Sequence, residues 1–179
     1  MSEKKAQTRE RILQAAASAM LQRGPQEPGV ADVMSAAGLT VGGFYAHFAS
    51  KDALMLEVFE QLLRRRRDLM ALLDSSLPGE ERRTLAASFY LSRKHRDATH
   101  SGCPLPSSLG ALPQLPETYR TLLAEHLEVL SAEMCDSPEE ADKALADLAL
   151  MVGGLALARA LGAGDLSDRI LRAAKSAVI

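Results

Sequence analysis

The stretch from Val30 to Leu54 constrains the fold most, because two short helix patterns lie in it with one tight turn between them. The first pattern covers about residues 30–37 and ends at Gly38, a residue suited to the left-handed conformation that closes a helix. Thr40 stands where its hydroxyl can cap the second pattern. Two short helices joined by a glycine-containing turn form a helix-turn-helix, which the sequence therefore predicts near the N-terminus.

The rest of the chain carries apolar residues at helical spacing, interrupted by Gly, Pro and Ser. Aromatic residues make up only 4% of the chain and Ala and Leu dominate, a composition that favours helix over sheet. We expect an all-α protein with a three-helix head at residues 1–50 and a helical domain at residues 51–179. The expected helices, about nine, cover residues 8–23, 30–37, a short run after Thr40, and 50–73, 80–96, 107–112, 117–135, 137–161 and 165–177.

Charge and hydropathy limit the function classes. The net charge is −2, but residues 1–51 hold six basic against four acidic side chains, while the remainder holds 15 against 19. A mildly basic head on an acidic body is compatible with DNA binding at one end. The longest apolar run, Leu148 to Ala158, is too short to span a membrane, and the first residues lack the apolar run of a signal peptide. We therefore expect a cytoplasmic, nucleoid-associated protein without a membrane partner.

The chemistry of enzymes and metal sites is not indicated. The sequence has no Ser/His/Asp order, phosphate loop or metal-spaced carboxylates, and Cys103 and Cys135 have no His or Cys at zinc-ligand spacing. We expect no catalytic activity, no cofactor and no metal. A disulfide between the two cysteines is not expected in a reducing compartment.

The second short helix of a helix-turn-helix enters the major groove of double-stranded DNA. Gly42 and Gly43 inside that helix cost about 2 kcal/mol against alanine, which is explained if the backbone must approach DNA closely. Tyr45 and His47 could reach phosphates. Lys51 lies in the first turn of the following helix, where its amine and the free N–H groups suit an anion.

The aromatic residues of this region have two possible roles. Phe44 and Phe48 lie four residues apart and fit the buried face of the short helix, which leaves Tyr45 facing outward; the alternative is that Tyr45 is a core aromatic. Further along, residues 64–67 form a run of four arginines. They could be a nucleic-acid patch, but their spread around a helix favours a solvated face or salt bridges to the acidic body.

The segment 38–54, with its Tyr-x-His-Phe block followed by Ser-Lys and Leu at fixed spacing, resembles the DNA-binding signature of the tetracycline-repressor (TetR) family. The run Thr8-Arg9-Glu10-Arg11-Ile12-Leu13 fits as well. The resemblance covers about 55 residues closely and extends to the whole chain by length and helix order. It implies that the third helix reads bases. The residues implied to bind DNA are Thr40, Val41, Gly42, Gly43, Tyr45, His47 and Lys51.

The resemblance also implies a second domain that binds a ligand in a helical cavity and pairs two subunits through its last two helices. The function implied is a homodimeric repressor that a small-molecule effector, mostly apolar with one polar or acidic group, releases from a pseudo-palindromic operator. The candidate pocket residues, each of which is otherwise ordinary core, are Phe89, Tyr90, Cys103, Leu109, Tyr119, Leu123 and Met151, with His95 and His100 as further polar anchors. Small residues at 152–158 allow close helix approach; the candidate dimer residues are Gly153, Gly154, Leu157, Leu161 and Ile170.

Two alternatives to effector release stay open at this point. Cys103 follows His95, Arg96 and His100 closely in sequence, so these groups could favour its reactive thiolate and make it a redox or electrophile sensor. The alternative is that Cys103 has no sensing role and is a small residue packed at the start of a helix. The other alternative is a constitutive DNA binder with a vestigial sensor domain.

Overall fold

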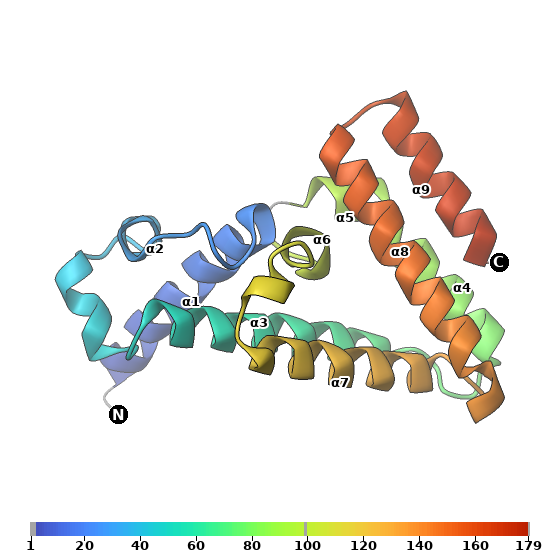
Figure 1. Ribbon diagram of the computed structural model, residues 1–179, viewed down its shortest axis with the longest axis horizontal. Helices are drawn as coiled ribbons and strands as arrows, with labels where there is room; N and C mark the ends of the chain where they lie inside the picture. The colour runs from blue at the N-terminus through green and yellow to red at the C-terminus, as the bar shows by residue number, and fades with distance from the viewer. Residues whose placement is uncertain (1–2, 99, 179) are drawn as a thin grey trace. The chain divides into compact units, whose positions relative to one another are not determined.

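A computed structural model describes residues 3–98 and 100–178, and within these residues it contains helices and no strand (Figure 1). The prediction of an all-α fold is confirmed. Nine α-helices and three short 3-10 helices are present in the described part of the chain. Their bounds are α1 Glu3–Arg23, α2 Val30–Ala36, η1 Val41–Ala46, α3 Lys51–Met70, α4 Gly79–Tyr90, α5 Arg93–Asp97, α6 Leu105–Ser108, η2 Leu112–Gln114, α7 Glu117–Glu133, η3 Pro138–Glu140, α8 Ala141–Leu161 and α9 Asp165–Val178.

The chain forms two compact units. The first falls within residues 1–63 and 99–119, and the second within residues 64–98 and 120–179. Each is a packing unit made from two separate stretches of chain. The functional division expected from sequence, 1–50 and 51–179, remains a prediction.

The first unit has its core between α1, α2, η1 and the start of α3. Two glycines with positive φ set the chain path: Gly24 at +77° ends α1, and Gly38 at +67° ends α2. The N–H of Gly38 donates to the Ser35 carbonyl at 2.9 Å, which closes the last turn of α2. The core side chains with under a tenth of their surface exposed are Ile12, Leu13, Ala16, Met20, Leu21, Val33, Met34, Phe44, Phe48, Leu54, Met55, Val58 and Phe59.

Helix α6 also belongs to the first unit. The hydroxyl of Ser107 donates to the carbonyl of Met20 at 2.9 Å. A Cβ placed on Gly24 would lie 2.5 Å from the Ser107 carbonyl oxygen, so only glycine allows this approach of the two segments. The end of α1 is thus tied to a segment more than eighty residues later in the chain.

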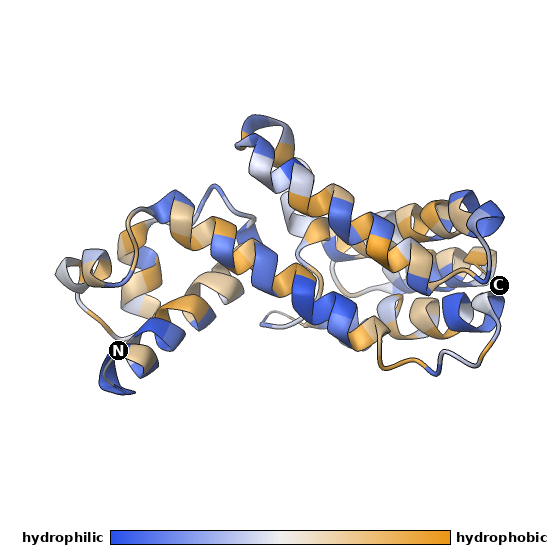
Figure 2. Ribbon diagram, turned by 90° about the horizontal axis from the view of Figure 1, so that it is seen from below, coloured by the Kyte–Doolittle hydropathy of each residue, from blue (hydrophilic) through white to orange (hydrophobic). Residues whose placement is uncertain are grey.

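The second unit is built on α8, which lies beside α9 as an antiparallel pair (Figure 1). By length and composition alone, the stretch Pro138–Leu161 would be apolar enough to cross a membrane. Its apolar character has a simpler cause, because one face of α8 packs inside the unit; Figure 2 shows that the helices mix hydrophobic and hydrophilic residues along their length. The residues of α8 buried on that face are Ala144, Leu148, Met151, Val152, Leu155 and Ala158.

Two expectations about single helices are wrong. The third helix is a 3-10 helix, η1, closed by bonds such as that from the Gly43 N–H to the Thr40 carbonyl at 3.1 Å, and the Thr40 hydroxyl makes no capping bond. The helix expected at 80–96 is broken after Tyr90. Ser92 lies at the break. Its hydroxyl donates to the Phe89 carbonyl near the end of α4 at 2.9 Å and accepts from the His95 N–H at 3.1 Å, which caps the start of α5.

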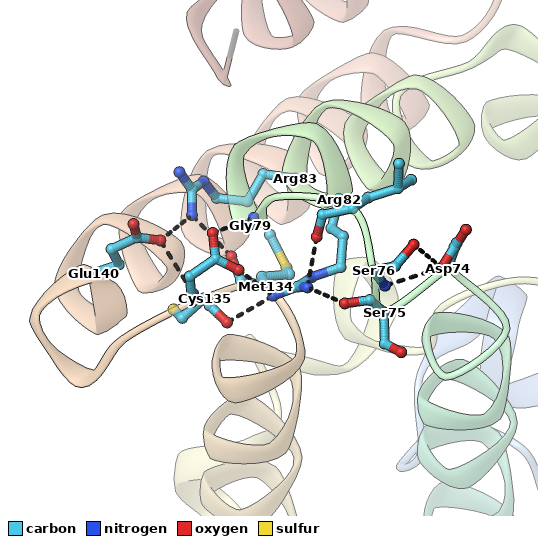
Figure 3. Close-up of polar contacts among 11 residues, drawn as sticks. Asp74, Ser75, Ser76, Gly79, Arg82, Arg83, Met134, Cys135 and Glu140 are labelled. Atoms are coloured by element: carbon cyan, nitrogen blue, oxygen red, sulfur yellow. Dashed lines mark hydrogen bonds and ion pairs between the residues drawn. The ribbon is translucent and has the colours of Figure 1, made fainter.

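Two buried arginines at the start of α4 hold the end of α7 (Figure 3). Arg82 donates to the carbonyls of Leu77 and Cys135 at 2.8 and 2.6 Å. Arg83 donates to the carbonyl of Met134 at 2.8 Å and pairs with Asp147 at 3.4 Å. The two carbonyls that directly follow α7 are therefore bound by side chains from a helix some fifty residues earlier, a long-range pairing that helical periodicity cannot reveal.

Candidate nucleic-acid interface

Two buried phenylalanines anchor the short helix η1 to the core of the first unit. Phe44 is fully buried and Phe48 is 5% exposed, as expected from their spacing. Their rings are stacked with centroids 5.8 Å apart, and the guanidinium of Arg9 lies 4.6 Å from the Phe48 ring centroid. These contacts fix the orientation of η1 on the first unit.

The opposite face of η1 points into solvent. Tyr45 is 72% exposed and Val41 49% exposed, so the alternative that Tyr45 belongs to the core is wrong. The Tyr45 ring leans edge-on against Phe44, with centroids 5.2 Å apart. Contact with buried Phe44 thus orients the Tyr45 ring, and the ring remains accessible from solvent.

Gly42 and Gly43 are not required by the packing of the chain. Neither has a positive φ. A Cβ on Gly42 would meet nothing within 4 Å, and one on Gly43 would meet only the methyl of Met34, at an ordinary contact distance of 3.8 Å. Packing within the described residues therefore does not require glycine at either position, although both glycines cost helix stability.

Lys51 makes a contact within the chain that the sequence did not predict. Its Nζ donates to the carbonyl of Gln26 at 2.8 Å and so holds the loop between α1 and α2. The helix start itself is capped as expected, since the Ser50 hydroxyl accepts from the Ala53 N–H at 3.0 Å. His47 is half-buried, and its Nδ1 has no hydrogen-bond partner among the described residues.

Sequence reasoning missed the role of Arg11. One of its terminal nitrogens donates to the carbonyl of Ala37 at 2.5 Å and lies 3.4 Å from that of Gly38. The guanidinium therefore caps the end of α2 and stiffens the turn that leads to η1. The only sequence signal was a basic residue on the polar side of α1, which is too common to single out.

The expected ligand-pocket residues divide between the two units. Cys103, Leu109 and Tyr119 lie in the first unit, where Cys103 and Tyr119 are buried; burial, with a smaller contribution from Asp52, raises the pKa of Tyr119 to about 12. The others, Phe89, Tyr90, Leu123 and Met151, lie in the second unit. Phe89 is 71% exposed on α4, so its side chain is not part of the core of the second unit.

The histidines expected as polar anchors are also separated. The His100 ring nitrogen Nδ1 lies 3.0 Å from the Ser18 hydroxyl in the first unit. His95, in the second unit, is buried with its Nδ1 2.9 Å from the Tyr90 carbonyl.

Among the expected dimer residues, Gly154 faces inward. A Cβ there would lie 2.8 Å from the Ala174 side chain and 3.2 Å from Leu91, so this glycine serves the packing of α8 against α9 within one chain. A Cβ added to its neighbour Gly153 would meet no atom within 4 Å. Leu157 and Leu161 are 59% and 53% exposed, and Ile170 is half-buried.

Two residues expected as polar anchors, Tyr90 and His95, lie together in the second unit, where Arg66 joins them in a contact that the sequence did not predict. Arg66 lies over the ring of Tyr90, 5.3 Å from its centroid, and Tyr90 stands edge-on to His95 with ring centroids 4.7 Å apart. His126 is 1% exposed. Burial, helped by the charges of Arg67 and Arg66, lowers the pKa of His126 to about 4, so the ring is neutral at pH 7.

Comparison with known proteins supports a DNA-binding fold. Residues 12–58 match the sequence model of the bacterial regulatory proteins, tetR family. No curated protein matches the sequence. A crystal structure of reduced NemR from Escherichia coli is 21% identical with a TM-score of 0.79, covering 96% of this chain and 95% of that one.

Two further structures are similar over nearly their whole length. A TetR-family transcriptional regulator from Agrobacterium tumefaciens is 21% identical with a TM-score of 0.79, covering 97% of this chain and 98% of that one. A TetR transcriptional regulator from Chloroflexus aurantiacus is 23% identical with a TM-score of 0.75, covering 99% and 94%. At these identities the similarity establishes the fold.

Proposed function

We propose that this chain, whose residues 12–58 match the sequence model of the bacterial regulatory proteins, tetR family, is a homodimeric transcriptional repressor, which binds a pseudo-palindromic operator and is released by a small-molecule effector. One observation carries the DNA-binding part. The helix η1 exposes Val41, Gly42 and Tyr45 on a base fixed by buried Phe44 and Phe48. Two glycines that the chain does not need for packing are explained by a DNA backbone or base edge close to η1.

In this proposal η1 enters the major groove. Val41, Gly42 and Gly43 face base edges, where side chains and close backbone approach read sequence. Thr40, Tyr45 and His47 contact phosphates, which position the protein without specifying sequence. Lys51 adds positive charge at the same edge while its amine holds Gln26.

The proposed dimer would use the outer faces of α8 and α9. Four leucines of these two helices are exposed, and exposed apolar side chains are available for contact with a second copy. Pairing with a second copy would cover them and present two η1 helices to two half-sites. The exposed leucines are Leu145, Leu157, Leu161 and Leu166.

Effector release requires a ligand that prefers the form unable to bind DNA. Helix α3 is a candidate carrier of this change, because residues 51–63 belong to the first unit and residues 64–70 to the second. By linkage, operator DNA must weaken effector binding by the same factor that the effector weakens DNA binding, typically 5–150-fold. A regulator of this kind would act in the cytoplasm, at the nucleoid.

The observed burial favours effector binding over the thiol alternative. Cys103 is 2% exposed, whereas redox sensors need an accessible thiolate. Cys103→Ser separates the two: a variant still released by a small molecule but indifferent to oxidant supports effector release. A variant that nothing can release would make the thiol the sensor.

The direct test starts from the wild-type chain and a pool of random DNA duplexes. Repeated selection is expected to recover an inverted repeat with half-sites roughly one helical turn apart. Light scattering is expected to give twice the 19.2 kDa chain mass. Failure to enrich any shared sequence would remove the DNA-binding proposal, and a monomer at micromolar concentration would remove the dimer.

A further inference from the structure

A row of contacts runs from helix α3 to the exposed ring of Tyr45. Glu57, on α3, accepts a hydrogen bond from a terminal nitrogen of Arg9 at 2.5 Å. The Arg9 guanidinium lies 4.6 Å from the centroid of the Phe48 ring, which is stacked with the Phe44 ring at a centroid distance of 5.8 Å. Phe44 stands edge-on to Tyr45, with ring centroids 5.2 Å apart. Arg9 is therefore linked to Tyr45 through two buried rings.

Arg9 connects three separate elements of the first unit. It lies on α1, its ionic partner Glu57 lies on α3, and the ring of Phe48 lies two residues beyond the end of η1. The side chains of Arg9 and Glu57 are each 30% exposed, so the pair is partly shielded from solvent. The second carboxylate oxygen of Glu57 accepts from the amide of Gln61 at 3.2 Å. A guanidinium held by a fixed carboxylate keeps its planar face over the aromatic ring, and so sets where η1 rests.

A basic residue of a DNA-binding head has a simpler possible role, which is direct attraction to a phosphate. The ion pair disfavours that role for Arg9, because Glu57 neutralises its charge and already binds one of its nitrogens. On electrostatic grounds alone Glu57 would oppose DNA binding, since a carboxylate repels phosphates. Its hold on Arg9 gives this acidic residue a role that charge alone does not.

We propose that Arg9 is a positioning residue for DNA binding. Together with Glu57 it orients η1 and, through the stacked rings of Phe48 and Phe44, the phenol of Tyr45. This inference rests on the proposed function, in that η1 and Tyr45 contact DNA. It adds the requirement that a domain binding an acidic polymer needs one of its own carboxylates, and neither Arg9 nor Glu57 has to touch DNA.

The sign of the effect at Glu57 tests the proposal. Glu57→Gln removes one negative charge, so electrostatics alone predicts equal or tighter DNA binding, whereas loss of positioning predicts weaker binding. We expect the affinity for the duplex selected by wild-type protein to fall about threefold or more, as the loss of a charge-assisted hydrogen bond implies. Binding by Glu57→Gln that is as tight as that of wild type, or tighter, would overturn the proposal.

Glu10 supplies a matched control. It is exposed on α1 and accepts from the amide of Gln14 at 3.0 Å, just as Glu57 accepts from Gln61. Within the described part of the chain no ion pair joins Glu10 to an arginine. Glu10→Gln removes the same charge and is expected to raise the DNA affinity or leave it within about twofold. Equal losses in Glu10→Gln and Glu57→Gln would mean a general effect of the substitution and overturn the role of Arg9.

A double-mutant cycle tests whether Arg9 and Glu57 act together. Arg9→Met keeps a long apolar side chain at Phe48 and removes the guanidinium. Arg9→Met alone and combined with Glu57→Gln should weaken DNA binding to about the same extent, because either change breaks the same pair. The salt slope of Arg9→Met should equal that of wild type, whereas loss of a direct phosphate contact would lower it by about one. A lowered slope, or losses that add, would overturn the positioning role.

The environment of Tyr45 can be read without DNA. The chain has three tyrosines, so protein labelled with fluorotyrosine gives three fluorine NMR signals, and Tyr45→Phe identifies that of Tyr45. Arg9→Met and Glu57→Gln are expected to shift this signal in the folded protein, and Glu10→Gln to leave it in place. A role limited to stability would weaken DNA binding through unfolding and leave the signal of the folded protein unmoved, which would overturn the proposal.

Thermal unfolding of each variant is measured on the same preparations. Should Arg9→Met not fold, Glu57→Gln and its control Glu10→Gln still decide. If wild-type protein binds a selected duplex and Glu57→Gln binds it as tightly as Glu10→Gln does, this inference fails and the proposed regulator stands. If no duplex is ever selected but the Tyr45 signal moves in Glu57→Gln and Arg9→Met, the coupling of Arg9 to Tyr45 stands and the proposed regulator fails.

Discussion

Lys51 donates a hydrogen bond from its Nζ to the carbonyl oxygen of Gln26, 2.8 Å away, and so ties the start of α3 to the loop between α1 and α2. The charge expected to face a phosphate therefore also has a structural task. The two roles predict different results for different substitutions of this residue.

Lys51→Gln removes the charge and keeps an N–H donor, whereas Lys51→Ala removes both. We expect both variants to weaken DNA binding in equal proportion across operator variants and to lower the salt slope by about one, because a phosphate contact carries no sequence information. Only Lys51→Ala should also lower the free energy of unfolding, by about 1 kcal/mol. Band shifts over a salt series and urea titrations check this. Wild-type affinity and salt slope in Lys51→Gln would restrict Lys51 to its loop contact.

Gly42→Ala tests why η1 contains glycine. The added Cβ meets nothing within the chain, so the free energy of unfolding should stay equal or rise by up to about 1 kcal/mol. DNA affinity is expected to fall at least about tenfold if the backbone approaches DNA here. Band shifts and urea unfolding of the same preparation give both values. A stabilised variant with undiminished DNA binding would show that close approach at Gly42 is not needed.

Tyr45 and Phe44 are adjacent but opposite in environment, 72% exposed and fully buried respectively. Tyr45→Ala should change unfolding by under about 0.5 kcal/mol while weakening binding to every operator variant alike. Phe44→Ala should cost about 3–5 kcal/mol and lose DNA binding through loss of the folded head. Thermal melts and band shifts separate the cases, and unaltered DNA affinity in Tyr45→Ala would argue against the proposed surface.

Gly153 and Gly154 provide a matched pair on α8. Gly153→Glu puts charge on the outward face, so it should leave the subunit folded but monomeric. Gly154→Ala must displace Ala174 or Leu91 and is expected to destabilise each subunit by about 1–3 kcal/mol. Light scattering and melting curves distinguish these outcomes. A stable dimer in Gly153→Glu would exclude this face as the interface.

Two buried histidines predict loss of stability in mild acid. Burial lowers the pKa of His126 to about 4, with Arg67 and Arg66 adding to it. Burial also lowers the pKa of His95 to about 4. The bond to the Tyr90 carbonyl opposes this shift, and the charges of Arg66 and Arg159 add to it. The ordinary value is 6.5, so between pH 6.5 and 4 the unfolded chain binds more protons than the folded one.

The free energy of unfolding should therefore fall as pH drops through that window, by up to about 1.4 kcal/mol per pH unit for each histidine. Replacement of one histidine, as in His126→Gln, should roughly halve the slope. Urea unfolding at several pH values between 4 and 7 measures it. A slope that His126→Gln leaves unchanged would mean that His126 is not held neutral in the folded state.

The sequence anticipated those features that depend on residues close together in the chain. The helical spacing of apolar residues predicted the all-α fold, and Gly38, with its positive φ, ends the first short helix as expected. Phe44 and Phe48 were placed on the buried side because they lie four residues apart. The outward face of Tyr45 followed from the same periodicity.

Only the tertiary structure decided which neighbour each side chain meets. Lys51 binds a carbonyl 25 residues away, and Arg11 one 26 residues away, so neither role is visible in local spacing. Gly153 and Gly154 are equivalent in sequence, yet the rotation of 100° per residue along α8 turns one outward and the other against Ala174. Periodicity determines that a helix has two faces, whereas the packing of distant segments determines what each face contacts.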